Sequence, residues 1–473
     1  MAAQPIMRRA ALHAACACLL ALSACSDGPS AGPTEPTLPA PAAPGEDVQA
    51  VRCEADVQAR TVICEPYEAA PASGASLVRT LGAQGVDVRV TSSNVQYDSV
   101  TKVFGVDVTV QNLLVQKMGT ADGTTVSGIT VYFYAGPNVS TQGSAEVRNP
   151  DGRGFFTGAQ QPYFHWNEVL PLNAVSSVKH WEFDVSSAAT RFQFMVHVRT
   201  ELLPVVLFDR SVGGNRDIYR VALDGSDLVR MTKATGDDVN PTVGGNLVVF
   251  TSYRTGNAEL WSMPLTASAD DPQTRLTTTS AAETEPALSA DGTRLAYVSN
   301  AQFGTGKVWT ASPTMTGAAR ATPAGFGLDG APELAPAWAP TGNHLALVST
   351  GNGSPDVFDY AMPGTPVLVS GHADYSEVDP AWSLDPTPRL VYVSTKTGGG
   401  DLYLRGSSTP LTTNPGADAS PTWLRDGRIV YQEWAVSGGT VTLKWLDPTN
   451  PARSGVILPA GGGRIDRPFA VPY

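Results

Sequence analysis

The segment APAWAPTG at residues 335–342 is one of six copies of a short pattern in the second half of the chain. The other copies are EPALSADG at 285–292, DPAWS at 379–383, NPTV at 240–243, SPTWLRDG at 420–427 and RPFA at 467–470. Successive prolines stand 45, 50, 44, 41 and 47 residues apart. A repeat of about 40–50 residues that carries several short strands is typical of a β-propeller. We therefore expect one blade for each copy.

Further short strands follow each proline segment in a fixed order. An apolar strand comes first, as in VVFTS at 248–252 and LVYVS at 390–394, and a strand that opens with an acid comes next. The acid-led strands are DIY at 217–219, ELW at 259–261, DVF at 356–358 and DLY at 401–403, whereas KVW at 307–309 opens with lysine. A short outer strand, such as 410–412, then completes a predicted blade of four strands.

The count of strands predicts how the ring closes. Three strands at about 205–232 precede the first proline, and the sixth proline strand at 467–471 follows the last blade. We expect this last strand to complete the first blade, which would leave no free sheet edge in the ring. An apolar residue two places after each proline is expected to pack between neighbouring blades: Val243, Leu288, Trp338, Trp382, Trp423 and Ala470.

These repeats resemble those of the TolB-like propeller family, which are shared in weaker form with the propellers of prolyl oligopeptidase-type peptidases. The resemblance covers residues 204–473 and implies a six-bladed propeller there. In the TolB family the propeller docks envelope lipoproteins, so the resemblance implies an envelope protein as partner. That family has a mixed α/β N-terminal domain and no lipid anchor, and this chain departs from it in both respects.

Five acidic residues form the candidate site of the propeller. They stand three places before the proline in five of the six copies: Asp238, Glu283, Glu333, Glu377 and Asp418. If they precede the innermost strands, they gather at one mouth of the central channel, where their mutual repulsion would favour a bound cation such as Ca²⁺. In the structural alternative, each acid hydrogen-bonds to backbone or a hydroxyl group of a neighbouring blade. The acids that open the third strands, such as Asp217 and Asp401, are expected to be hydrogen-bond partners within their own blades.

The first 24 residues have the form of a signal peptide. Arg8 and Arg9 precede an apolar run that is too short for a stable membrane span. The run ends in LSAC at 22–25, which resembles the lipobox of bacterial lipoproteins. This resemblance implies cleavage before Cys25, acylation of its thiol, and a lipid anchor in the outer membrane, facing the periplasm or the cell surface. The alternative is an ordinary secretory signal that ends near Ala24.

Residues 25–47 and the remaining cysteines fit an exported protein. The segment 25–47 is rich in proline and alanine and is predicted to be a tether without a core of its own. Cys53 and Cys64 are then the only cysteine pair left, and they flank a predicted hairpin that turns near residues 59–60. In an oxidising compartment we expect them to form a structural disulfide.

Residues 48–203 are predicted to form a β-sandwich domain of immunoglobulin-like pattern. Runs such as ITVYF at 129–133 and FQFMVHV at 192–198 alternate between apolar and polar residues, and turn signals separate them. The length exceeds that of one such module, so the disulfide hairpin is expected to be an appendage. The run YFHWNE at 163–168 is open to two interpretations, an exposed aromatic patch that binds sugars or aromatic residues of the sandwich core.

Charge and motif content exclude several functions. The chain has 32 basic and 44 acidic residues and a formal net charge of −12, which argues against nucleic acid or an anionic membrane surface as partner. Membrane contact is expected only through the lipid. The histidines are scattered without ligand spacing, and neither a His-Glu-x-x-His nor a Gly-x-Ser-x-Gly motif occurs.

The sequence therefore predicts an all-β protein: an N-terminal β-sandwich followed by a six-bladed β-propeller that the C-terminal strand closes. We expect a monomeric, non-catalytic binding scaffold for an envelope protein or for a cell-wall or extracellular glycan. No cofactor is expected, with Ca²⁺ as the one candidate. The contrasting hypothesis is a cation-dependent lyase or hydrolase that uses the five acids as its working groups.

Overall fold

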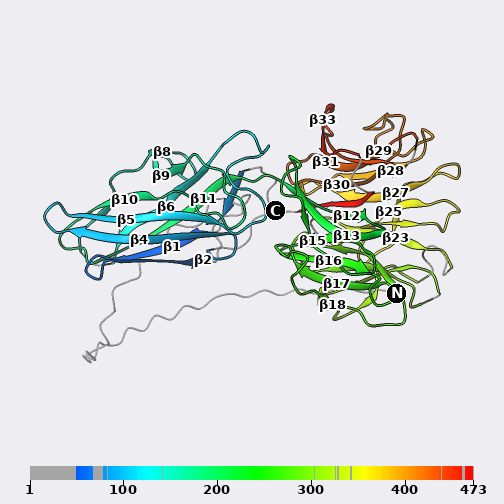
Figure 1. The fold of residues 1–473 in the computed structure, drawn as a ribbon, viewed down its shortest axis with the longest axis horizontal. Helices are drawn as coiled ribbons and strands as arrows, with labels where there is room; N and C mark the ends of the chain where they lie inside the picture. Colours follow the sequence, from blue (N-terminus) through cyan, green and yellow to red (C-terminus); the bar gives the residue numbers. More distant parts are fainter. Residues whose placement is uncertain are drawn as a thin grey trace, which may run out of the picture. The chain divides into compact units, whose positions relative to one another are not determined.

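The computed structural model describes ten segments of the chain: residues 50–67, 78–81, 84–140, 142–302, 304–324, 326, 330–340, 343–437, 439–460 and 464–471. The predicted signal peptide, Cys25 and the tether lie outside these segments. All regular elements within them are β-strands, which confirms the all-β class (Figure 1). None of these residues belongs to a helix long and apolar enough to cross a bilayer.

The strands β1 to β11 form two antiparallel sheets. The larger sheet has the order β2 (Thr61–Tyr67), β1 (Ala50–Asp56), β11 (Arg191–Glu201), β6 (Ile129–Val139), β9 (Gln161–Trp166) and β8 (Gly152–Gly154), and β3 (Val78–Leu81) also pairs with β11. The smaller sheet has the order β4 (Val88–Asp98), β5 (Val103–Asn112), β10 (Lys179–Val185) and β7 (Ala145–Val147). Their strands alternate between buried and more exposed residues, because one face of each sheet packs on the other.

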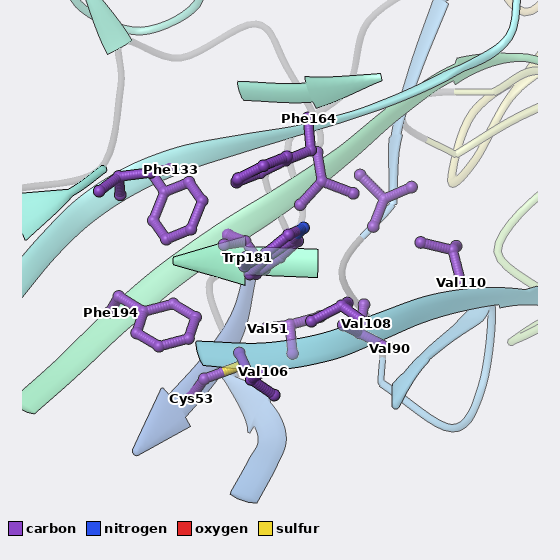
Figure 2. Packing of buried hydrophobic residues seen from close by; sticks show 14 of the residues in the cluster. Val51, Cys53, Val90, Val106, Val108, Val110, Phe133, Phe164, Trp181 and Phe194 are labelled. Carbon is purple, nitrogen blue, oxygen red and sulfur yellow. The ribbon is translucent and has the colours of Figure 1, made fainter. Parts of the chain in front are cut away.

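One hydrophobic core joins the two sheets. Phe133, Phe164 and Phe194 of the larger sheet surround Trp181 of the smaller one (Figure 2). The Trp181 ring stacks on Phe164 with 4.9 Å between the ring centroids, and all four side chains are almost completely buried. Large aromatic side chains that bury this fully are the main apolar contribution to such a core.

The disulfide hairpin is an integral part of the larger sheet. Cys53 and Cys64 face each other across β1 and β2 and are bonded, as predicted. The turn is held by Asp56, whose side chain accepts the backbone N–H of residues 58 and 59. The expectation of an appendage is wrong: β1 also pairs with β11 along Val51–Asp56, because the second edge of β1 needs partners for its own backbone groups.

Six further sheets form the propeller. The first contains β14 (Val229–Arg230), β13 (Asn215–Ala222), β12 (Val205–Val212) and β34 (Ile465–Ala470). The next three are β15 (Asp238–Gly244) to β18 (Thr274–Arg275), β19 (Glu283–Leu288) to β22 (Ala319–Arg320), and β23 (Glu333–Trp338) to β26 (Val367–Ser370). The last two are β27 (Glu377–Trp382) to β29 (Asp401–Leu404) and β30 (Asp418–Trp423) to β33 (Asn450–Leu458).

The inner strands of these sheets are the six proline segments. The strands in the middle of the second to sixth sheets, and the last strand of the fifth, are β16 (Leu247–Ser252), β17 (Glu259–Pro264), β20 (Leu295–Ser299), β21 (Lys307–Ala311), β24 (His344–Ser349), β25 (Asp356–Ala361), β28 (Leu390–Ser394), β29, β31 (Ile429–Trp434) and β32 (Val441–Asp447). The fifth sheet has three strands. Its predicted outer strand at 410–412 is reduced to one hydrogen bond, from the N–H of Leu411 to the carbonyl oxygen of Leu402.

The last strand completes the first sheet. β34 pairs antiparallel with β12, so that Ala470 lies opposite Val206, and the N–H of Val471 donates to the carbonyl oxygen of Val205. In Figure 1 the red strand accordingly lies beside β12. The sheet of β12, β13, β14 and β34 is thus built from both ends of the propeller sequence, as the strand count predicts. Whether the stability of the ring depends on this pairing stays a prediction.

Apolar clusters fill the spaces between successive sheets. Phe250 and Met263 of the second sheet pack with Ile218 of the first, and Leu345 of the fourth packs with Val298 of the third. The apolar residues two places after the prolines belong to these clusters, with Val243, Leu288, Trp423 and Ala470 buried, and Trp338 and Trp382 packed at the cluster margins. Their predicted position between blades is confirmed.

Candidate binding site in the propeller

The residue before each inner-strand proline has a left-handed backbone conformation. The φ angles lie between 45° and 54° for Asn240, Glu285, Ala335, Asp379, Ser420 and Arg467. The strand pairing is shifted at this point; in β19, for example, Thr284 faces Val298 and Ala287 faces Ala296. Each site is therefore a β-bulge. Positive φ is uncommon outside glycine, and a residue before proline is normally extended, so this conformation must be held by its surroundings.

Carboxylates of the preceding blade hold three of these six bulges. Glu285 Oε2 accepts the N–H of Ala335 at 2.6 Å, and Asp379 Oδ2 accepts the N–H of Ser420 at 3.1 Å. The Ser420 hydroxyl also donates to Asp379. In the first blade the equivalent residue is Arg467, which has no acceptor atom, and Asp209 of β12 accepts the N–H of Asn240 at 3.1 Å instead.

These pre-proline residues line a pocket on the propeller axis, which we call the central pocket. Its volume is about 150 Å³. Proline side chains and the residues two places after them complete its wall, including Trp338, Trp382 and Trp423. Along each inner strand the pre-proline residue comes first and the tryptophan position follows, so the pocket has a polar end and an aromatic end.

Three charged residues lie at the polar end, and they are the only charged residues in the described lining. Arg467 Nη1 is 3.4 Å from Asp379 Oδ1, and Arg467 Nη2 is 3.8 Å from Glu285 Oε1. Asp379 first, and then Glu285, raise the pKa of the Arg467 guanidinium further above its ordinary value. Two carboxylates and one guanidinium give this end a formal charge of −1. The charges come from the first, third and fifth blades, and the blades between them contribute Asn240, Ala335 and Ser420.

The five acids predicted from the sequence lie elsewhere. Asp238, Glu283, Glu333, Glu377 and Asp418 are the first residues of the inner strands β15, β19, β23, β27 and β30. Each is at most 3 % exposed, and none lines the central pocket. They lie between successive blades, where each comes close to the residue that opens the third strand of the blade before it. We call these five places the blade junctions.

Hydrogen bonds at the junctions match the structural alternative only in part, because several partners belong to the acid's own blade. Glu283 Oε1 accepts from the hydroxyls of Thr279 and Ser299, and Glu377 Oε1 accepts from the Ser370 hydroxyl. Asp238 pairs with Arg254 at 2.8 Å, and Asp418 Oδ1 accepts from the Asn414 side-chain amide at 3.1 Å. The other oxygen of each of these four acids is buried without a hydrogen-bond partner: Asp238 Oδ1, Glu283 Oε2, Glu377 Oε2 and Asp418 Oδ2.

Burial raises the pKa of three of these acids, Glu283, Glu377 and Asp418, and so favours their protonated form. Burial raises the pKa of Asp418 to about 7, and repulsion from Glu433 and Asp401 adds to the effect. Burial likewise raises the pKa of Glu283 and of Glu377, and the neighbouring acids Glu259 and Asp356 contribute. A carboxyl group with a buried, unpaired oxygen is stabilised by keeping its proton, because desolvation penalises the charged form.

The third junction differs because lysine replaces the acid of the third strand. Lys307 Nζ lies 3.4 Å from Glu333 Oε1 and donates to the carbonyl oxygen of Ala331 at 2.7 Å. Both side chains are completely buried. Glu333 also accepts from Arg320, the Thr322 hydroxyl and the N–H of Val308, so both of its oxygens have partners.

The acids that open the third strands bond within their own blades, as predicted. Asp217 pairs with Arg230 at 2.6 Å, and Glu259 pairs with Arg275 at 2.7 Å. The Thr412 hydroxyl donates to Asp401 and accepts the N–H of Leu402. These contacts fix the outer segment to the third strand in the first, second and fifth blades.

The aromatic run of the sandwich divides between the two faces of β9. Phe164 and Trp166 are buried in the core, which confirms the core interpretation for them. Tyr163 points to the opposite face of the sheet, where its ring lies 5.2 Å from that of Tyr132, and Phe156 stacks on Tyr132 at 5.1 Å. Of the Tyr, Phe and Trp residues of this run, only Tyr163 therefore lies on the outer face.

Across the described segments, no group of three or more His, Cys, Asp or Glu side chains is arranged to hold a metal ion. The residues that the sequence interpretation missed are Glu285, Asp379 and Arg467. A signal for them was present, since the position before the proline alternates between charged and uncharged residues in successive copies.

The fold and the site thus define an all-β protein with a six-bladed propeller and a charged, aromatic pocket on its axis. No protein-family model matches the chain, and no curated protein matches it in sequence. Among solved structures it is similar to TolB from Acinetobacter baumannii, at 15% identity and a TM-score of 0.48, over 57% of this chain and 67% of that one.

Two enzymes are also among the similar structures. A puromycin-hydrolyzing peptidase of Mycobacterium tuberculosis matches at 13% identity and a TM-score of 0.40, over 78% of this chain and 53% of that one. Oligogalacturonate lyase from Vibrio parahaemolyticus matches at 9% identity and a TM-score of 0.35, over 54% of this chain and 72% of that one. With TM-scores under 0.5 these likenesses carry no argument about function, and the propeller fold rests on the strand pairing itself.

Proposed function

We propose that this chain is an exported lipoprotein, anchored through Cys25, whose propeller is a non-catalytic binding scaffold for an envelope protein or glycan. The observation that carries the proposal is the ring of six strained residues around the central pocket. Backbone strain of this kind costs about 1–3 kcal/mol for each residue and concentrates at ligand sites. Six copies in one ring indicate a pocket whose shape is maintained at a cost to stability.

The hydrogen bonds around the pocket support a binding role. Glu285 and Asp379 each use one oxygen to hold the bulge of the next blade. Two of the six bulges in the wall are therefore held in place before any ligand arrives, and a preorganised site loses less entropy on binding. The lining combines apolar and aromatic surface with a few placed polar groups, as small binding sites generally do.

Affinity capture from envelope extract tests this role. The bait is the full-length protein, and the variants are Trp382→Ala in the pocket wall and Val456→Ala on the exposed strand β33. We expect the wild type and Val456→Ala to retain the same partner and Trp382→Ala to lose it. Retention of every partner by a folded Trp382→Ala variant would show that the pocket is not the site of binding.

The lipid anchor is tested separately. Cys25→Ser removes the thiol that would carry the lipid, so the variant should leave the membrane fraction and fail to incorporate a labelled fatty acid. Cys53→Ser serves as the matched control, because its sulfur is expected to be in the disulfide. Equal labelling of the wild type and Cys25→Ser would contradict anchoring at this residue.

Metal analysis tests the non-catalytic assignment against a cation-dependent enzyme. Glu333 already has Lys307, Arg320 and Thr322 as partners, which leaves little capacity for a metal ion at its junction. We expect purified protein to hold no stoichiometric Ca²⁺. A tightly bound ion that the double variant Glu333→Gln, Glu377→Gln loses would favour the enzyme hypothesis instead.

A further inference from the structure

We propose that the central pocket receives a positively charged side chain, lysine or arginine, from a partner protein. This inference rests on the proposed scaffold function and specifies the chemistry of its ligand. Three properties of the pocket lead to it: its size, the charge at its polar end, and the tryptophans at its other end.

The size of the pocket favours a single side chain. Sites for free small molecules and cofactors usually measure about 300–1,000 Å³. At about 150 Å³, the central pocket is smaller than that range. A sugar ring with neighbours on both sides would need a longer or wider opening, whereas an extended side chain needs only a narrow one. The size therefore favours a protein partner over a glycan.

The charge of the pocket selects a cation. Among the described lining residues, Arg467 is the one positive group opposite Glu285 and Asp379, and its nearest nitrogen lies 3.8 Å from Glu285 Oε1, beyond hydrogen-bonding distance. Among the described residues Glu285 Oε1 accepts no hydrogen bond, while Oε2 is used by Ala335. A ligand cation at this end would give Glu285 a donor and bring the formal charge from −1 to zero.

The aromatic end suits the remainder of such a side chain. Lysine and arginine carry apolar stems that pack on apolar surface while the head stays at a polar group. The tryptophans of this wall already stack on guanidinium groups elsewhere: Arg294 lies 4.2 Å from the Trp338 ring and Arg389 lies 4.5 Å from the Trp423 ring. Trp382 has no cation over its ring among the described residues, so its ring face is open to the stem of the ligand side chain, while the charged head lies at the polar end.

Binding of matched small probes to the full-length protein tests the inference. The probes are N-acetyl-arginine amide, N-acetyl-lysine amide and N-acetyl-citrulline amide, and the readout is the indole resonance or fluorescence of Trp382. Citrulline amide has the shape of the arginine probe without its charge. We expect saturable binding of the two cations and binding of citrulline that is weaker by about tenfold or more.

Asp379→Asn and Glu285→Gln each remove one charge and keep an oxygen that can hold the next bulge. We expect either variant to weaken the arginine probe by about tenfold and to leave the melting temperature nearly unchanged. Three results would overturn the inference. They are equal binding of the arginine and citrulline probes, no binding of either cationic probe up to its solubility limit, and undiminished binding of the arginine probe in both folded variants.

The outcome also separates this inference from the function on which it rests. If the Trp382-dependent partner is captured but the cationic probes do not bind, the scaffold stands and only the cation assignment fails. If neither the probes nor any Trp382-dependent partner binds, both fail. A partner whose capture is lost after its lysines are acetylated would support both, because acetylation removes the charge and leaves the stem.

Discussion

The sandwich and the propeller stabilise their interiors in different ways. In the described part of strands β1 to β11, no aspartate, glutamate, lysine or arginine is buried, and the core is aromatic and aliphatic. The propeller buries Lys307 and many acids: Asp209, Asp217, Asp238, Glu259, Glu283, Glu333, Asp356, Asp359, Glu377, Asp401, Asp418 and Asp466. The same chain therefore has one domain that buries no Asp, Glu, Lys or Arg in its described strands and one domain that buries many.

The difference follows from how the sheets meet. Two sheets packed face to face satisfy their backbone within each sheet, so the space between them can be wholly apolar. Blades in a ring meet at the ends of their inner strands as well, where bulges and strand starts leave N–H groups without partners. Carboxylates such as Glu285 and Glu333 accept these N–H groups, and the propeller gains defined junctions at the cost of buried charge.

The largest change in the free energy of unfolding is expected at the third junction, where Lys307 balances the charge of Glu333. Lys307→Met keeps most of the unbranched stem of the side chain and leaves Glu333 without its buried ammonium partner. Removing one member of a buried ion pair usually costs about 3–5 kcal/mol. Chemical denaturation should show a loss of this size, with Lys396→Met, on the exposed surface, as the control. A loss below about 1 kcal/mol would mean that Arg320 and Thr322 suffice for Glu333.

The disulfide should affect only the domain with the apolar core. Replacing both Cys53 and Cys64 by alanine removes a link between residues 11 positions apart. A link that closes a loop of this size stabilises by roughly 3 kcal/mol. Calorimetry should show a lower transition for the sandwich and the same transition for the propeller. An equal shift of both transitions would contradict the view that the two cores are energetically separate.

The pH dependence of stability should come from the propeller. The pKa of Asp418 is about 7 in the folded protein and near 3.8 in the unfolded chain, so the folded state holds this proton more tightly. The stability that this bound proton contributes to the folded state is fully present below about pH 4 and is lost as the pH rises to about 7. Asp418→Asn cannot lose a proton in this way. Relative to the wild type, we expect the free energy of unfolding of this variant to be higher by about 1–3 kcal/mol at pH 8 and almost unchanged at pH 4.

Urea denaturation at both pH values measures this gain. Glu146→Gln, an exposed acid on β7 of the sandwich, is the matched control and should change stability equally little at both. A gain for Asp418→Asn of the same size at pH 4 and pH 8 would show that the substitution acts through packing and not through the proton.

The smallest change in the free energy of unfolding is expected from removal of the Thr412 hydroxyl. Thr412→Val keeps the shape of the side chain and removes the group that bonds both Asp401 and the N–H of Leu402. The loss of such a buried hydrogen bond costs about 1–2 kcal/mol. Thr387→Val, at an exposed position, is the control for denaturation. An unchanged free energy of unfolding would mean that Leu402 finds another acceptor.

Much of the fold could be predicted because short, repeated sequence patterns identify its strands. The prolines mark the six inner strands, and the alternation in ITVYF at 129–133 marks a half-buried strand of the sandwich. The disulfide followed from elimination, since Cys53 and Cys64 were the only cysteines beyond the predicted signal and lipid site. The integration of their hairpin into the larger sheet could not be predicted, because the pairing of β1 with β11 joins residues about 140 positions apart.

The site was harder to predict, because its position depends on tertiary geometry. Glu283 and its equivalents do begin the inner strands, as expected. Whether the first residue of an inner strand reaches the central pocket depends on the tilt of its blade, which the sequence does not give. The position before proline is extended by local preference, and the bulge in each inner strand overrides this preference. That single change brings Glu285, Asp379 and Arg467 onto the propeller axis.

Site-directed photocrosslinking in intact cells tests the central claim, that the propeller binds its partner at the central pocket. A photoreactive amino acid replaces Leu384 in the pocket lining in one variant and Val456 on the exposed strand β33 in the other. We predict a specific crosslinked adduct at position 384 that is absent at 456 and disappears when Asp379→Asn is added. Adducts only at 456, or an adduct at 384 that is indifferent to Asp379, would contradict the account.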